Sequence, residues 1–201
     1  DYIDEENCAR ALGFYTAWIG CVAAMNEELI PDFAAAGAIL AQKYINEEAE
    51  RDTVIGTAED KMKYLAGRMR AAVLNFKLAS DVARVDELAE VLYVPTTSKE
   101  TSGDMPWLDY AEKLIPTRIG EGFPFDKVRI PKKDRRPLPD GVIYGPLSLI
   151  LSAMDGKKTL KQAICEAAWE RRVNMTDADV KKYVNAVMYL ADWGYLSVEN
   201  P

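Results

Sequence analysis

The chain has 201 residues, a hydrophobic fraction of 49% and a formal net charge of −7, from 25 basic and 32 acidic side chains. Such a composition is typical of a globular protein with one good core or two small ones. The acidic balance argues against a phosphate-binding surface and makes nucleic acid an unfavourable default partner. The sequence contains no histidine, which is the usual general base near neutral pH and the commonest metal ligand. We therefore expect no catalytic site and no metal or cofactor site in this chain.

The first apolar stretch, residues 11–25, reads ALGFYTAWIGCVAAM and carries no charge. It is shorter than the roughly 20 apolar residues that cross a bilayer, so we predict a buried helix and no membrane span. A helix that is apolar on nearly every side must be covered on nearly every side. Either the other helices of this chain surround it, or it packs on something outside the chain. Trp18 is the candidate interaction residue in the second case.

Three more helices are predicted before residue 95. The first covers about 32–50 and begins after Pro31, a favourable first helical position. We expect it to turn one apolar face to the core, formed by Phe33, Ala36, Leu40 and Tyr44. The second runs from Thr57 through Phe76, and the third follows Ser80. Together these helices predict a mostly antiparallel array.

Two groups of carboxylates could suggest catalysis or metal binding: the acidic residues within 1–6 and those within 47–50. Glycoside hydrolysis needs a fixed carboxylate separation, and calcium needs a ligand-spaced loop. Neither group has such a pattern. We therefore expect the side chains of 47–50 to be solvated at a helix end.

Residues 95–142 are rich in proline, which opposes helix, and predict an extended connector with at most one short helix at 107–114. This stretch contains the basic candidate interaction residues Arg129, Lys132, Lys133, Arg135 and Arg136. They indicate either an anion or nucleic-acid patch, or a solvated strap held against the acidic helical domain. The strap is favoured, because the run contains no aromatic residue and is interrupted by Asp134.

The last 58 residues predict three short helices followed by a strand. A helix at 144–154 precedes a turn at 155–158, and capping boxes at Thr159 and Thr176 open the next two helices. The third helix ends at Gly194, and 195–198 alternates like a strand. This is the winged-helix pattern, and Lys181 and Lys182 on its third helix are candidate interaction residues. Nearby aspartates counter that pair, so protein is favoured over DNA as its partner.

The predicted fold is therefore mainly α: an N-terminal helical array (1–94), a Pro-rich extended connector (95–142) and a winged-helix-like domain (143–201). The aromatic residues of the last domain, Trp169, Tyr189 and Trp193, are expected in its core. Cys8 and Cys21 are about 20 Å apart if helical, too far for a disulfide. With Cys165 they predict buried reduced thiols and a cytoplasmic protein.

A family resemblance follows from two segments. Asp1–Glu6, with Ala11-Leu12 and the apolar helix that holds Trp18, resembles the segment after the last metal-binding histidine of co-catalytic di-zinc aminopeptidases. This family includes leucyl aminopeptidases and glutamate carboxypeptidase. Asp155–Leu160 is similar to an Asp-Gly-Lys-x-Thr-Leu turn in the terminal winged helix of larger bacterial members, and Tyr144–Leu147 resembles the element before that turn. The resemblance touches about 1–30 and 140–200.

The resemblance implies a zinc-dependent parent hydrolase whose histidine lies just ahead of Asp1. It transfers no zinc ligand and no catalytic acid to this chain, so zinc is implied for the parent enzyme alone. The expected function is a non-catalytic accessory segment that positions or oligomerises the catalytic domain. Its partner would be its own upstream catalytic domain or another subunit, with a homo-oligomer as a further option. The alternatives are a stand-alone winged-helix regulator that binds DNA or protein, and a helical scaffold that binds only proteins.

Overall fold

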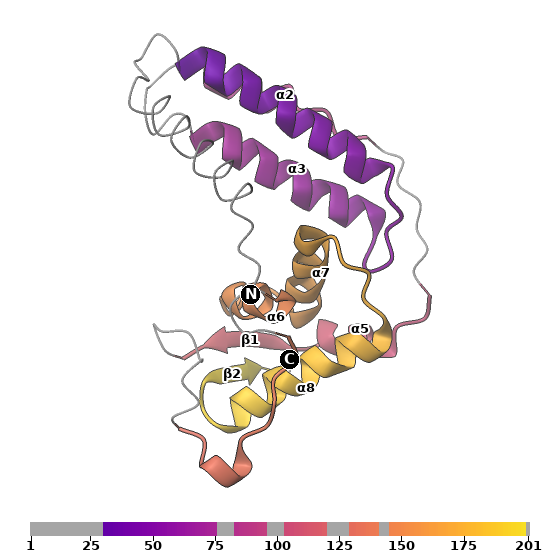
Figure 1. Ribbon diagram of the computed structural model, residues 1–201, viewed down its shortest axis with the longest axis vertical. Helices are drawn as coiled ribbons and strands as arrows, with labels where there is room; N and C mark the ends of the chain where they lie inside the picture. The colour runs from indigo at the N-terminus through magenta and orange to yellow at the C-terminus, as the bar shows by residue number, and fades with distance from the viewer. Residues whose placement is uncertain (1–29, 76–82, 96–102, 120–128, 141–144, 200–201) are drawn as a thin grey trace, which may run out of the picture. The chain divides into compact units, whose positions relative to one another are not determined.

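The computed structural model describes residues 30–75, 83–95, 103–119, 129–140 and 145–199 (Figure 1). These residues are mainly helical and include one small two-stranded sheet, which confirms the mainly α prediction. Contacts between Cα atoms divide the chain into two compact units, 1–46 with 66–94 and 47–65 with 95–201.

The predicted helix at 11–25 lies outside the described residues, as do Trp18, Cys8 and Cys21. Within the described ranges, no helix has both the length and the apolar character needed to cross a membrane.

The first unit is built from parts of α2 (Ile30–Ala49) and α3 (Ala58–Leu74), together with α4 (Ala83–Glu90). The face predicted to be buried on α2 was wrong, because Leu40 is 67% exposed and Ala36 is also exposed. Two apolar stripes at helical spacing exist in this helix, and the stripe rich in alanine is the buried one. Its members are Ile30, Ala34, Ala38, Ala41 and Ile45.

Side-chain hydrogen bonds attach the segment after α4 to the two long helices. The amide of Gln42 donates to the carbonyl oxygen of Tyr93 (3.0 Å) and accepts from the Tyr93 backbone N–H (2.8 Å). Arg70 of α3 donates to the carbonyl oxygen of Leu92 (3.1 Å). These bonds satisfy backbone groups that have no partner in a helix or sheet.

The second unit contains four further α-helices: α5 (Pro106–Glu112), α6 (Pro146–Ser152), α7 (Leu160–Arg171) and α8 (Asp177–Asp192). A 3₁₀ turn, η2, covers Lys132–Asp134. Helix α6 packs on α7, while α5 contacts both α7 and α8. Fully buried aliphatic side chains fill the space between these helices and supply most of the hydrophobic stabilisation. They include Leu147, Ile150, Leu151, Leu160, Ile164 and Leu190.

Helices α7 and α8 begin where their capping boxes were predicted. Thr159 accepts from the Gln162 backbone N–H, and the Gln162 side chain accepts from the Thr159 backbone N–H. Thr176 and Asp179 form the same reciprocal pair at the start of α8. Each box satisfies two donors that a helix N-terminus otherwise leaves without partners.

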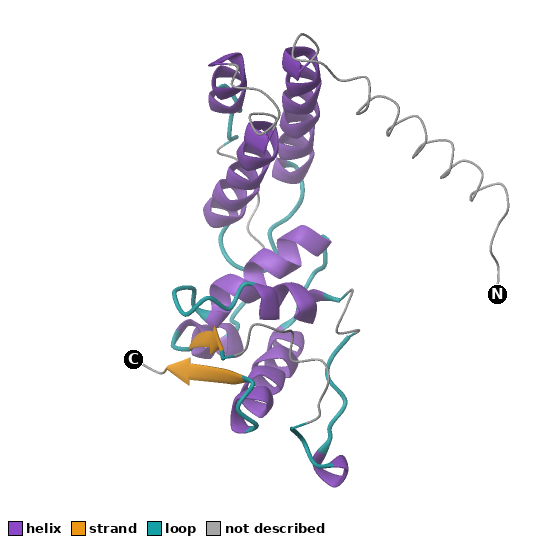
Figure 2. Cartoon of the chain, turned by 90° about the vertical axis from the view of Figure 1, so that its left-hand side faces the viewer, coloured by secondary structure: helices purple, strands orange, loops and turns teal. Residues whose placement is uncertain are grey.

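The sheet pairs β1 (Ile115–Arg118) with β2 (Leu196–Glu199) in antiparallel fashion, with Ile115 opposite Glu199. Figure 2 shows the two strands as neighbouring orange arrows. The sequence predicted β2 but not β1, because Pro116 is unusual inside a strand. Instead of donating, Pro116 accepts a hydrogen bond at its carbonyl oxygen from Gly156 N–H (3.2 Å).

The turn at 155–158 packs closely against β1. Its Gly156 has φ of +76°, and a Cβ there would lie 2.6 Å from Oγ1 of Thr117. Asp155 Oδ1 accepts from the backbone N–H groups of Lys158 and Lys157, which hold the pKa of this carboxyl below its ordinary value. The predicted turn therefore exists, and only glycine fits its second position.

The Pro-rich stretch is more than a linker over its described residues. Leu108, Ala111, Leu114 and Ile130 from this stretch are buried in the same core as α6, α7 and α8. The order of three helices and a strand after residue 143 is as predicted. The winged-helix assignment and the domain division 1–94, 95–142 and 143–201 stay predictions.

Candidate functional site

The basic run in the Pro-rich stretch, residues 129–136, forms a segment that we name the basic strap. Its first residue is attached to the segment that follows α8. The Arg129 backbone N–H donates to the hydroxyl oxygen of Tyr195 (3.1 Å), and Arg129 Nη1 donates to the carbonyl oxygen of Gly194 (2.8 Å). The guanidinium carbon also lies 5.3 Å from the centroid of the Tyr195 ring, a cation–π contact.

The other end of the basic strap is attached to Tyr189 of α8. The Tyr189 hydroxyl donates to the carbonyl oxygen of Asp134 (2.9 Å) and accepts from the backbone N–H of Arg136 (3.1 Å). The Arg136 guanidinium lies 5.4 Å from the centroid of the same ring. Within the strap, Arg135 Nε donates to the carbonyl oxygen of Ile130 (3.0 Å). Two tyrosines therefore fix the backbone of the strap at both ends.

The basic strap and the C-terminal end of α8 enclose a hollow of about 420 Å³. We call it the basic hollow; it is lined by Lys133, Asp134, Arg135, Arg136, Tyr189, Asp192 and Trp193. Its three basic side chains are exposed, its two carboxylates offset part of their charge, and Trp193 is half-buried. The hollow thus combines a local positive excess with aromatic surface.

The structure corrects the sequence interpretation of this run in one respect. The missing aromatic residues are supplied by Tyr189 and Trp193, which are distant in sequence. Arg129 donates to the carbonyl oxygen of Gly194, and the Arg136 guanidinium lies over the ring of Tyr189 in α8. The core assignment holds for Tyr189, which is 7% exposed, but that residue also lines the hollow. A spacing of four residues between positions 189 and 193, on one helix face, was the signal that could have paired them.

The two candidate lysines of α8 are engaged elsewhere. Lys182 Nζ lies 2.7 Å from Asp179 Oδ1, and Lys181 Nζ lies 5.0 Å from the centroid of the Trp107 ring. Hydrogen bonds from the Lys182 and Thr176 side chains lower the pKa of Asp179 to about 2. These lysines do not line the basic hollow. Lys133, Arg135 and Arg136 do, Lys132 is an exposed neighbour in the strap, and Trp18 lies outside the described residues.

In the described part of the chain, no group of three or more His, Cys, Asp or Glu side chains is placed to hold a metal ion. Cys165 is a buried free thiol, and burial raises its pKa to about 12. A thiol that stays protonated in this way is a poor nucleophile.

Comparison with protein-family models, with curated proteins and with solved structures finds no match to this chain.

Proposed function

We propose that this chain is a non-catalytic interaction module that binds an acidic segment of a protein partner in the basic hollow. The observation that carries the proposal is the attachment of the basic strap to Tyr189 and Tyr195. Because hydrogen bonds already hold the strap's backbone, a partner need not order it on binding. A prearranged set of cations is what an acidic ligand requires.

The side chains of the hollow are those that contribute most to protein interfaces. Arginine offers a planar fork that pairs with a carboxylate through two hydrogen bonds, and Arg135 and Arg136 both line the hollow. Trp193 and Tyr189 add aromatic surface, and Trp, Tyr and Arg are the residue types enriched among binding hot spots. The proposed contact therefore pairs acidic side chains with the arginines and an apolar group with Trp193.

A protein partner is favoured over nucleic acid because the hollow offers few cations. Asp134 and Asp192 lie among these cations and offset part of their charge. The net charge of −7 opposes any anionic partner, and it opposes a long polyphosphate more than a short acidic segment. Proteins that bind DNA tightly make about six to ten phosphate contacts. Three cations beside two carboxylates suit a short acidic segment better than a long phosphate backbone.

The resemblance to di-zinc aminopeptidases supplies the candidate partner. Under this proposal, the hollow positions or oligomerises a zinc-dependent catalytic domain, in the same polypeptide or in another subunit. The coding sequence immediately upstream of Asp1 tests this part. A metal site rich in His, Asp and Glu is expected there, and its absence would remove the aminopeptidase-like parent. The alternative of a winged-helix regulator is motivated by the helix order of α6, α7 and α8 before β2.

The binding experiment uses a fluorescein-labelled polyglutamate peptide and measures anisotropy at several salt concentrations. The test variant Lys132→Glu/Lys133→Glu reverses two charges at the strap. The control Lys113→Glu/Lys157→Glu changes the net charge by the same amount at two other exposed lysines. We expect the test variant to bind the peptide roughly fivefold to tenfold more weakly, because it loses two exposed lysine–carboxylate pairs. The control should bind with an affinity close to that of the wild type.

Equal losses in both double variants would show that net charge alone controls binding and would overturn the proposal. Tighter binding of oligothymidylate than of polyglutamate, lost in the test variant, would favour the nucleic-acid alternative instead.

A further inference from the structure

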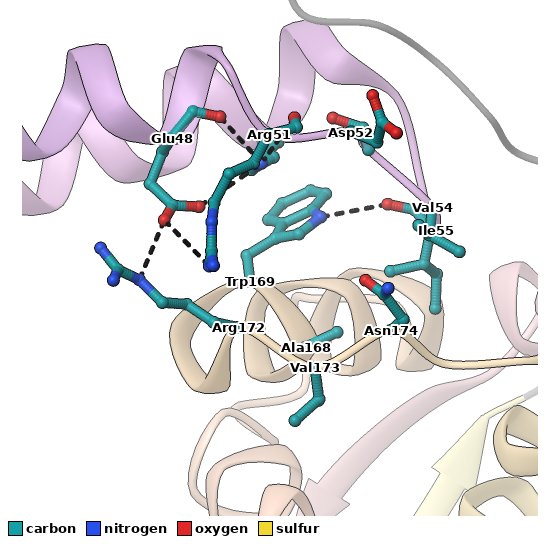
Figure 3. A pocket seen from close by; sticks show the side chains of 12 residues that line it. Glu48, Arg51, Asp52, Val54, Ile55, Ala168, Trp169, Arg172, Val173 and Asn174 are labelled. Carbon is teal, nitrogen blue, oxygen red and sulfur yellow. Dashed lines mark hydrogen bonds and ion pairs between the residues drawn. The ribbon is translucent and has the colours of Figure 1, made fainter.

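Glu48, in the last turn of α2, is buried rather than solvated, which corrects the sequence expectation for 47–50. Its side chain is 2% exposed. Arg172 Nε lies 2.9 Å and Arg51 Nη1 3.7 Å from its Oε1, while Lys61 Nζ lies 3.5 Å from its Oε2. Figure 3 shows the carboxylate flanked by the guanidiniums of Arg51 and Arg172. Buried carboxylates require such partners, because desolvation of an unpaired charge is costly, so these ion pairs have a structural role.

An apolar groove with a volume of about 400 Å³ lies between α5 and α8 in the second unit. We name it the α5–α8 groove. It is lined by Pro106, Trp107, Tyr110, Val184, Asn185 and Met188. Aromatic and aliphatic walls with few polar groups, in a volume between roughly 300 and 1,000 Å³, are typical of binding sites.

The aromatic walls of the groove are held in place by other contacts. The Trp107 backbone N–H donates to Oδ1 of Asp177, the first residue of α8 (2.8 Å), which attaches the start of α5 to that helix. The Tyr110 ring meets the Trp107 ring edge to face, with centroids 5.8 Å apart. Lys181 Nζ lies 5.0 Å from the centroid of the Trp107 ring, a cation–π contact. A partner therefore need not order these walls on binding.

Polar groups at the rim of the groove are available to a partner. Asn185 and Tyr110 are exposed, and within the described ranges the Asn185 amide and the Tyr110 hydroxyl have no hydrogen-bond partner. Met188 is half-buried, and its flexible thioether adapts to aromatic rings. Apolar walls with polar groups at their edge suit a large apolar side chain carried on a polar backbone.

The groove continues into the basic hollow along α8. Met188 lines the groove, and the next residue, Tyr189, lines the hollow. Asn185 of the groove and Asp192 of the hollow are two helical turns apart, on the same face of α8. Two turns correspond to about 11 Å along the helix axis. An extended chain rises about 3.3 Å per residue, so three to four residues of a partner span this distance.

We infer that the α5–α8 groove binds an aromatic side chain of the same partner segment whose acidic residues bind in the basic hollow. This inference rests on the proposed function and names the partner more closely. The segment carries acidic residues and, three to four residues away, an aromatic residue. Its ring packs against Trp107, Tyr110 and Met188, through the edge and sulfur contacts that aromatic rings favour.

The test measures fluorescence anisotropy with the full chain and fluorescein-labelled peptides that differ at one residue. EEEEGGGF is compared with EEEEGGGG, and FGGGEEEE with GGGGEEEE, because a bound chain can run along α8 in either direction. We expect one phenylalanine peptide to bind roughly fivefold to tenfold more tightly than its glycine counterpart, because a partly buried ring gains part of its transfer free energy.

Two results separate this inference from the proposed function. Equal affinities within both peptide pairs would overturn the inference and leave the proposed function in place. Glycine peptides that do not bind, or whose binding is unchanged in Lys132→Glu/Lys133→Glu, would overturn the proposed function and this inference with it.

Two tyrosine variants locate the ring. Tyr110→Ala removes one wall of the groove, and the control Tyr93→Ala removes an exposed ring that lines neither surface. The two side chains are exposed, so both variants should fold. We expect Tyr110→Ala to abolish the gain from phenylalanine without changing the affinity for the glycine peptides, and Tyr93→Ala to retain that gain. A gain that survives Tyr110→Ala would contradict the inference. A wild-type dimer that Tyr110→Ala dissociates, seen by analytical ultracentrifugation, would show that a second copy fills the groove and would also overturn it.

Discussion

Replacement of Gly56 by alanine tests how the 47–65 segment packs against α7. Gly56 has φ of +71°, and a Cβ there would lie 2.9 Å from Cζ2 of Trp169 and 3.1 Å from Sγ of Cys165. Left-handed backbone costs alanine about 1–2 kcal/mol. Forcing an extra methyl into a packed core costs about 1–3 kcal/mol. Both neighbours are buried, with Trp169 8% and Cys165 3% exposed, so they have little room to move. We expect Gly56→Ala to lower the free energy of unfolding by about 2–5 kcal/mol, with the two contributions taken together.

The matched control is Gly67→Ala in α3, where an added Cβ meets no described atom within 4 Å. There the same change should stabilise the chain by about 0.5–1 kcal/mol, because alanine loses less conformational entropy in a helix. Urea unfolding measures both. Tryptophan fluorescence reports mainly on the unit that contains Trp107, Trp169 and Trp193, three of the four tryptophans, and circular dichroism follows the helices. A Gly56→Ala effect below about 0.5 kcal/mol, within the range of ordinary surface changes, would refute this account of the packing.

Three further predictions concern Thr159, Cys165 and Asp179. Thr159→Ala should lower the unfolding free energy by about 1 kcal/mol through loss of the α7 cap, whereas Thr159→Ser should stay near wild type; equal stability of all three proteins in urea would contradict the capping role. Iodoacetamide at pH 8 should leave Cys165 unmodified in the folded protein, because burial raises the pKa of its thiol to about 12; rapid native labelling at this residue, mapped by mass spectrometry, would show that the thiol is accessible and ionised. The pKa of Asp179 is lowered from 3.8 to about 2, so its stabilising contribution is present above pH 4 and is lost as pH falls towards 2. The difference in unfolding free energy between wild type and Asp179→Asn should therefore shrink across that window. A difference that does not vary with pH would be inconsistent with the shift.

Local signals in the sequence were sufficient to predict most of the described helices. Thr159 and Thr176 mark the starts of α7 and α8 through hydrogen bonds to residues three positions ahead. Such patterns depend on neighbours in sequence alone, and they are read without knowledge of the fold. The strand β1 was missed because Pro116 disfavours strands, and only pairing with β2 reveals it.

The features that the sequence did not predict depend on contacts between residues that are distant in sequence. Glu48 resembled a surface residue until Arg172, more than a hundred positions away, was placed beside it. The basic run lacked aromatic residues until α8 brought Tyr189 and Trp193 to it. On α2, two stripes of equal periodicity competed, and periodicity alone does not identify the stripe that its neighbours bury.

The most direct test of the proposed function follows the indole N–H signals of the tryptophans by ¹H–¹⁵N NMR as the polyglutamate peptide is added. Trp193 lines the basic hollow, whereas Trp169 and Trp107 do not. Single Trp→Phe variants assign the signals. The account predicts a saturable shift of the Trp193 signal, with those of Trp107 and Trp169 unchanged. Binding that leaves the Trp193 signal in place would contradict the assignment of the basic hollow as the interaction site.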